Sequence, residues 1–133
     1  YSSAASDVYK RQQIFLSARN IPIIYDDRIM EMCFGTYEGI ENSFEIPDCP
    51  INVLFKDPVN YIPVENGESF EQLFARTGEF LEQAVRPQLE DGKDVLIVGH
   101  GAMNSSIVCQ IKNEPLENFW KAGIKNCKLM KLI

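Results

Sequence analysis

The stretch that decides the fold is VLIVGHGAMNSSIVCQI, residues 95–111. Its first four residues are apolar and three of them are β-branched, which is typical of a strand buried on both faces of a parallel sheet. After a Gly-His-Gly turn, apolar residues recur at helical spacing: Met103, Ile107, Val108 and Ile111. The stretch therefore predicts a strand, a tight turn and a helix.

His100, in that turn, is the only histidine of the chain. It lies at the carboxyl end of the predicted strand, where open α/β sheets bind ligands. The first N–H groups of the following helix are free there, and helix N-termini favour anions, above all phosphate. The alternative is a histidine that only fills a turn. The glycines on both sides leave room for the backbone to approach a ligand, and so favour the anion site.

The composition indicates one soluble globular domain. The chain has 133 residues, 45% of them hydrophobic, and a net charge of −6, so a broad nucleic-acid surface is not expected. There is no apolar run long enough for a membrane span and no signal peptide. Four scattered cysteines predict reduced thiols in a cytoplasmic protein: Cys33, Cys49, Cys109 and Cys127.

The first residues look foreign to the domain. SSAASDVYKRQ, residues 2–12, is reproduced by one reading frame of a transposon adapter used to prepare sequencing libraries. We therefore interpret residues 1–12 as a non-native segment and residues 13–133 as the domain. The alternative is a genuine polar N-terminal helix.

The rest of the chain divides into regular elements and one irregular region. Residues 13–20 predict the end of a helix, and residues 21–24 a short edge strand. Residues 40–67 carry four prolines and several aromatic residues without a clear period. This pattern favours an insertion or lid over a pocket, although a plain surface loop stays possible.

The strongest helix signal follows, in residues 67–91. Ser69 and Gln72 form a capping box, an apolar stripe follows, and Pro87 predicts a kink or an end. Residues 128–133 predict a last strand. The fold class is therefore α/β, a three-layer α/β/α sandwich with a mostly parallel sheet and residues 95–98 in an interior strand.

Glu31 is the second candidate site residue. It stands among Ile29, Met30, Met32 and Phe34. A carboxyl group in such an apolar neighbourhood can hold its proton and act as a proton donor. The pattern alone leaves open that Glu31 simply points to solvent.

Three segments, taken in order and spacing, resemble the histidine phosphatase superfamily, the phosphoglycerate mutase-like proteins. They are RIMEMCFGTYEG (28–39), GESFEQLFARTGEFLE (67–82) and VLIVGHG (95–101). The resemblance implies phosphoryl transfer from a small phosphorylated metabolite through a phosphohistidine, with no cofactor. The family's nucleophile lies in an Arg-His-Gly motif on the first strand, and this chain has no such motif. We therefore expect a partial domain that lacks the first strand, is unstable alone and is catalytically inactive.

The resemblance also implies roles for residues of this chain. Glu31 matches the acid that protonates the leaving oxygen, and His100 matches the second histidine, which binds phosphoryl oxygens. The N–H groups of Gly101 and Ala102 would complete the substrate-binding cradle. No metal is expected, because one histidine and scattered carboxylates make no closed ligand set.

Several functions stay open or are excluded. The resemblance does not separate phosphatase from mutase, and a non-catalytic phosphate-binding module of the same fold is the alternative to an enzyme. A dinucleotide-binding domain is disfavoured, because no G-x-G-x-x-G follows a strand. A serine hydrolase is disfavoured, because the G-x-S-x-G motif is missing.

Overall fold

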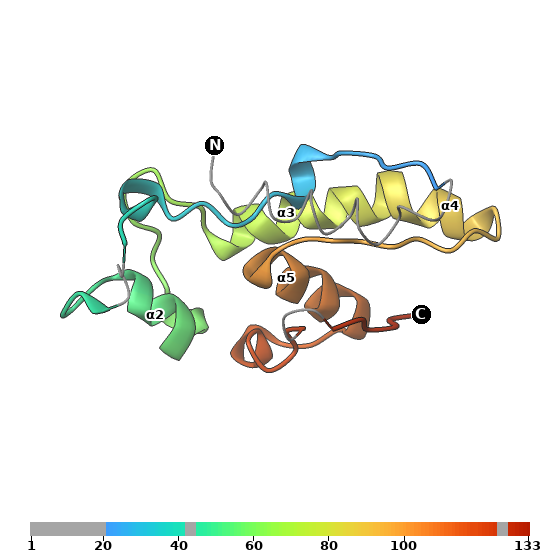
Figure 1. The fold of residues 1–133 in the computed structure, drawn as a ribbon. Coiled ribbons are helices and arrows are strands. Elements are labelled where there is room, and N and C mark those ends of the chain that lie inside the picture. The colour runs from blue at the N-terminus through green and yellow to red at the C-terminus, as the bar shows by residue number, and fades with distance from the viewer. Residues whose placement is uncertain (1–20, 42–44, 125–127) are drawn as a thin grey trace.

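The computed structural model describes residues 21–41, 45–124 and 128–133. Within these ranges the regular elements are helices, and a long helical rod crosses a shorter helix beside it (Figure 1). The elements are η1 (Asp27–Ile29), η2 (Gly35–Tyr37), α2 (Ile51–Lys56), η4 (Pro58–Asn60), α3 (Phe70–Phe80), η5 (Leu81–Val85), α4 (Arg86–Glu90), α5 (Gly101–Lys112) and η6 (Leu116–Asn118). Predicted features in residues 1–20, and Cys127, lie outside the described residues.

The predicted capping box begins α3. The Ser69 hydroxyl accepts the N–H of Gln72 at 3.2 Å, and the Gln72 side chain accepts the N–H of Ser69 at 2.9 Å. The helix does not end at Pro87, which lies in the first turn of α4. A proline clashes with the carbonyl four residues before it, and the turn just before α4 is widened into the π-helical η5.

Helix α5 begins where the sequence predicts, directly after the Gly-His-Gly turn. It ends at Asn113, which takes the left-handed conformation (φ 54°). Its inner face packs on α3, and a polar network is buried between the two helices. The Thr77 hydroxyl accepts hydrogen bonds from the Ser106 hydroxyl at 3.0 Å and from the Gln110 amide at 2.8 Å. α3 and α5 therefore form one rigid pair.

Residues 45–67 are anchored to the core and not loosely attached. Ile51 and Leu54 of α2 are fully buried. The indole N–H of Trp120 donates to the carbonyl of Leu54 at 2.6 Å, and the Trp120 ring stacks on Phe55 with ring centroids 4.8 Å apart. The lid role of this region stays a prediction.

The predicted strands are not formed among the described residues. Residues 21–24, 95–98 and 128–133 have no ladder partner there, and only one isolated bridge is present, between Phe34 and Gly67. Val95 and Leu96 are 36% and 47% exposed, so the expected burial of this strand on both faces is wrong for this chain. A strand needs a neighbour to accept its backbone hydrogen bonds, and no described segment supplies one.

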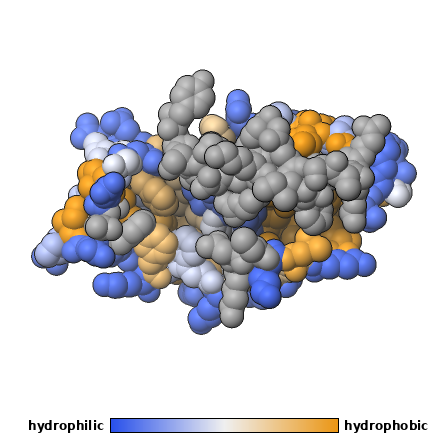
Figure 2. Space-filling view, in the orientation of Figure 1, coloured by the Kyte–Doolittle hydropathy of each residue, from blue (hydrophilic) through white to orange (hydrophobic). Residues whose placement is uncertain are grey.

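One side of residues 95–98 is nevertheless covered. Ile97 packs against a core cluster of Phe80, Val85, Met103 and Ile107. Figure 1 shows this segment running back beside α3 toward the start of α5. Other hydrophobic side chains reach the surface in several places, seen as orange atoms in Figure 2. The segment therefore has an inner face and an open edge.

In the part of the chain that the structure describes, no helix has the length and apolarity to cross a membrane. Cys33, Cys49 and Cys109 are free thiols, and the last two are buried.

Candidate active site

The carboxylate of Glu31 lies on the N-terminal end of α5. Its Oε2 accepts the N–H of Ala102 at 3.2 Å, and its Oε1 accepts the N–H of Met103 at 3.0 Å. Oε1 also accepts the N–H of Met32 at 2.8 Å. Glu31 is half-buried, so the alternative in which it simply points to solvent is wrong. Its charge meets the positive end of the α5 dipole and two N–H groups that the helix cannot satisfy itself.

His100 is the residue directly before the first turn of α5. Its backbone is extended (φ −101°), and its carbonyl accepts the N–H of Asn104 at 3.0 Å, which starts the helix. The imidazole is half-buried. His100 thus directly precedes the helix end that Glu31 caps, although no strand leads into that helix. That the two side chains open onto the same cleft stays a prediction.

The two glycines beside His100 have different roles. A Cβ built on Gly99 would lie 1.7 Å from Cε of Met103, a fully buried side chain. A Cβ on Gly101 would lie 3.8 Å from the Glu31 carboxylate, an ordinary contact. A side chain at Gly99 would force the buried Met103 side chain to move, so packing alone accounts for this glycine and its presence is not evidence for a ligand.

The predicted phosphate cradle is partly occupied by the protein itself. The sequence assigns the N–H groups of Gly101 and Ala102 to a phosphoryl group, but the Ala102 N–H is bonded to Glu31. Among the described residues, no acceptor is bonded to the N–H of Gly101. The carboxylate shows that this helix end accepts an anion, and that the anion in this structure is Glu31.

Two arginines missed by the sequence analysis hold the Glu31 segment on α3. The first is Arg28, whose guanidinium donates to both oxygens of Asp26, at 2.9 and 2.7 Å. These hydrogen bonds hold the pKa of the Asp26 carboxyl below its ordinary value and raise the pKa of Arg28. Arg28 also donates to the side chain of Gln83 at 2.9 Å, which ties η1 to η5.

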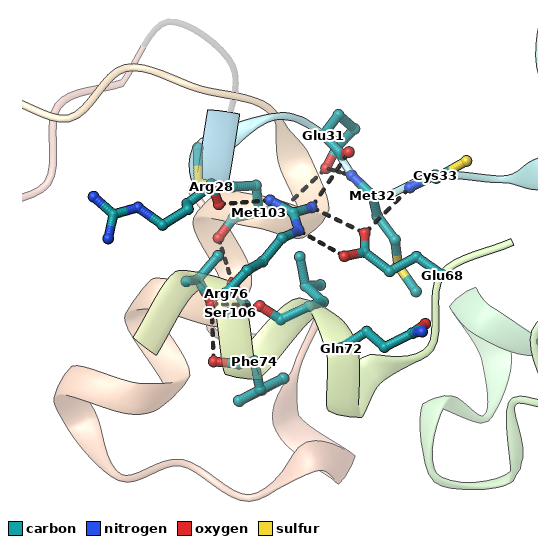
Figure 3. A network of polar contacts seen from close by, with 12 residues as sticks. Arg28, Glu31, Met32, Cys33, Glu68, Gln72, Phe74, Arg76, Met103 and Ser106 are labelled. Carbon is teal, nitrogen blue, oxygen red and sulfur yellow. Dashed lines mark hydrogen bonds and ion pairs between the residues drawn. The ribbon is translucent and has the colours of Figure 1, made fainter. Parts of the chain in front are cut away.

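The second is Arg76, at the centre of the network in Figure 3. Its Nε and Nη2 donate to the two oxygens of Glu68, at 2.6 and 2.9 Å. Its Nη1 donates to the carbonyl of Arg28 at 2.6 Å, and its Nη2 reaches the carbonyl of Glu31 at 3.4 Å. Glu68 and Arg76 both lie in the GESFEQLFARTGEFLE segment. Nothing in the spacing of that segment shows that Arg76 contacts carbonyls 48 and 45 positions earlier in the chain.

A shallow hollow of about 380 Å³ lies beside this network, lined by Cys33, Asn66, Gly67, Glu68, Gln72 and Arg76. Neither Glu31 nor His100 lines it. In its polar wall Glu68 is paired with Arg76, and Gln72 accepts the N–H of Ser69. No group of three or more histidine, cysteine or acidic side chains is arranged for a metal within the described ranges.

The segments that carry this site match a known family. The family model of the histidine phosphatase superfamily (branch 1) covers residues 1–133. The chain belongs to the histidine phosphatase superfamily. The match includes residues 2–12, whose suspected adapter origin stays a prediction.

Curated relatives of this superfamily member are named either as phosphatases or as phosphoglycerate mutases. Phosphoserine phosphatase 1 of Hydrogenobacter thermophilus is 25% identical over 95% of this chain, and a second protein of that organism, named "Putative phosphoserine phosphatase 2", is 28% identical over 99% of it. A 2,3-bisphosphoglycerate-dependent phosphoglycerate mutase of Cytophaga hutchinsonii is 30% identical over 61% of the chain. The chain spans 59%, 64% and 38% of these relatives, respectively.

A solved structure supports the fold. The alpha-ribazole phosphatase of Shigella flexneri superposes with a TM-score of 0.66, at 22% identity, over 90% of this chain and 59% of that one. This likeness fits the predicted α/β class. The roles of Glu31, His100, Gly101 and Ala102 are not tested by it and stay predictions.

Proposed function

We propose that the protein to which this histidine phosphatase chain belongs transfers the phosphoryl group of a small phosphate ester through a phosphohistidine. The observation that supports the proposal is that the Glu31 carboxylate accepts two N–H groups in the first turn of α5, the helix that His100 directly precedes. A proton donor and a phosphate-binding group are the two parts that this chemistry needs besides the nucleophile.

The proposed reaction has two steps, and each residue has a defined role in them. A histidine nitrogen attacks phosphorus while the bond from phosphorus to the leaving oxygen breaks. His100 and the Gly101 N–H donate to the phosphoryl oxygens and offset the charge that grows there. Glu31 gives its proton to the leaving oxygen, because an alkoxide leaves poorly. In the second step water attacks the phosphohistidine and Glu31 takes a proton from it.

The nucleophile must come from outside this chain. His100 is the only histidine, and it occupies the phosphate-binding position. We therefore propose that the chain is inactive as written. We also propose that the missing first strand pairs with residues 95–98 in a three-layer α/β/α sandwich, which the open edge at Val95 and Leu96 supports.

The Glu31 contact implies an order of events. A phosphoryl group that takes the Ala102 N–H must replace the Glu31 carboxylate, which is then free to face the leaving oxygen. Substrate binding and delivery of the proton donor are thereby one movement.

The test restores the missing half of the site. In this experiment residues 1–12 are replaced by a family N-terminal segment that carries the Arg-His-Gly strand. We call the product the repaired chain. It should hydrolyse a generic aryl phosphate, whereas the original chain should not. His100→Ala in the repaired chain should lower kcat by about 10²–10³-fold. Full activity in His100→Ala would refute the assignment.

A non-catalytic phosphate-binding module is the second candidate. It is favoured by the Glu31 carboxylate, which caps α5 as a structural residue would. Under this alternative the repaired chain binds inorganic phosphate by calorimetry but turns over neither aryl nor alkyl esters. Turnover abolished by alanine at the supplied nucleophile would exclude it. Family membership does not decide between phosphatase and mutase, and relatives of both names are present.

A further inference from the structure

We infer that Arg76, held by Glu68, is the positioning residue for the Glu31 carboxylate. The inference rests on the proposed function for its catalytic consequence, but its structural part does not. Arg76 touches no reacting atom. It acts through the backbone on which Glu31 is mounted.

Arg76 and Glu68 together bind three peptide groups of the backbone around Glu31. Arg76 binds the carbonyl of Arg28 before Glu31 and the carbonyl of Glu31 itself. Glu68 accepts the N–H of Cys33 after it, at 3.3 Å, through the same Oε2 that receives Arg76. Because the segment is held at three peptide groups, the Cα–Cβ bond of Glu31 has little freedom to change direction. The contacts therefore fix the direction in which the side chain points.

The same helix also fixes the target of that side chain. Thr77, the neighbour of Arg76, is bonded to Ser106 and Gln110 of α5. α3 therefore contacts the Glu31 segment through Arg76 and contacts α5 through Thr77. The separation between the carboxylate and the helix end is set by two adjacent residues of one rigid helix, and errors of about 1 Å in such placements cost rate.

The contacts need an arginine. Three of its nitrogens serve two carboxylate oxygens and two carbonyls in one plane, whereas a lysine ammonium is a point charge on a flexible stem. The Arg76 and Glu68 side chains are only 22% and 13% exposed, so solvent screens this pair less than a surface pair. Arg86 and Glu82, one helical stretch further on, are both 60% exposed and form the matched surface pair.

The rival explanation is a salt bridge that only stabilises the fold. A general loss of structure lowers turnover of every substrate in the same proportion. Misplacement of Glu31 lowers turnover only of those substrates whose leaving oxygen needs a proton. Alkyl esters need it, and aryl phosphates with good leaving groups do not.

The first experiment uses this difference in the repaired chain. Arg76→Lys should lower kcat for an alkyl phosphate by about tenfold or more and keep kcat for an aryl phosphate within about twofold, at unchanged KM. Glu31→Gln should show the same pattern more strongly, and Arg86→Lys should alter neither rate. Equal losses on both esters, or no loss, would overturn the positioning role.

The second experiment needs no turnover. In the ¹⁵N-labelled repaired chain, the amide protons of Ala102 and Met103 report their bonds to Glu31. Arg76→Lys should move both resonances toward their positions in Glu31→Gln, and leave the Ser106 amide unchanged. Unmoved Ala102 and Met103 resonances would contradict the inference.

The two readouts separate the inference from the proposed function. If the repaired chain hydrolyses nothing but the amide resonances move as expected, the function fails and the positioning stands. If Arg76→Lys does not fold, Glu68→Gln replaces it, since it keeps the shape and removes the charge that holds Arg76. Glu68→Gln should move the same two amide resonances in the same direction, and their constancy would again overturn the inference.

Discussion

Oε2 of Glu31 lies 3.2 Å from the amide nitrogen of Ala102, 71 positions later in the chain. This bond joins the RIMEMCFGTYEG segment (28–39) to the residue that directly follows the VLIVGHG segment (95–101). It is made possible by α3, which binds the Glu31 segment through Arg76 and α5 through Thr77.

Loss of the Glu31 carboxylate should destabilise the repaired chain. Met32, Ala102 and Met103 are buried, so Glu31→Ala leaves three N–H groups without this acceptor, at a cost of about 1–3 kcal/mol for each that stays unpaired. Urea denaturation measures the change. Glu65→Ala, at an exposed side chain, should stay within about 0.5 kcal/mol of the parent. An unchanged midpoint for Glu31→Ala would mean that the cap contributes nothing.

Tyr61 should make stability depend on alkaline pH. Burial raises the pKa of its hydroxyl. The folded state therefore keeps the proton longer than the unfolded chain, so this contribution is full below about pH 10 and is lost as the pH rises through the raised pKa. Tyr61→Phe should reduce the fall in the free energy of unfolding above pH 10. Urea denaturation at each pH measures this free energy.

The same substitution should not harm stability at pH 7. The buried Tyr61 hydroxyl has no hydrogen-bond partner among the described residues, and its removal should leave stability equal or up to about 1 kcal/mol higher. Burial also raises the pKa of the Cys109 thiol, so a smaller slope of the same sign should remain in Tyr61→Phe. A slope identical to that of the parent would show that Tyr61 does not ionise differently on unfolding.

Thr77→Val should loosen the contact between α3 and α5. Valine keeps the shape but removes the oxygen that accepts from Ser106 and Gln110 at a fully buried position. We expect a loss of about 1–3 kcal/mol in the free energy of unfolding. Thr36→Val, at an exposed threonine, is the matched control and should change it by less than about 0.5 kcal/mol. Equal effects of the two substitutions would argue against the network.

Leu96 should respond differently in the two forms of the protein. It is 47% exposed in this chain, so Leu96→Thr should shift the weak unfolding transition expected of the original chain by less than about 0.5 kcal/mol. In the repaired chain the added strand should cover it, and the loss should rise to about 1.5–3 kcal/mol. Thermal and urea unfolding of both forms measure this difference. A small effect in both would refute pairing of the added strand beside residues 95–98.

Local signals in the sequence determined several elements correctly. The Ser69 capping box and the start of α5 after His100 depend on contacts within four residues, so the sequence alone predicts them. The three family segments likewise predicted membership of the superfamily, which the family model confirms.

The tertiary structure decided the rest, because it depends on partners far apart in the chain. An apolar run such as residues 95–98 predicts a tendency to be buried, but burial and a ladder require a neighbouring strand, which the described residues do not supply. The pattern around Glu31 suggested a carboxyl in an apolar site, yet its environment is set by the helix dipole and the N–H groups of α5. Nothing local showed that Arg76 holds the Glu31 segment, since the two groups it contacts there are peptide carbonyls, and every residue of a chain has one.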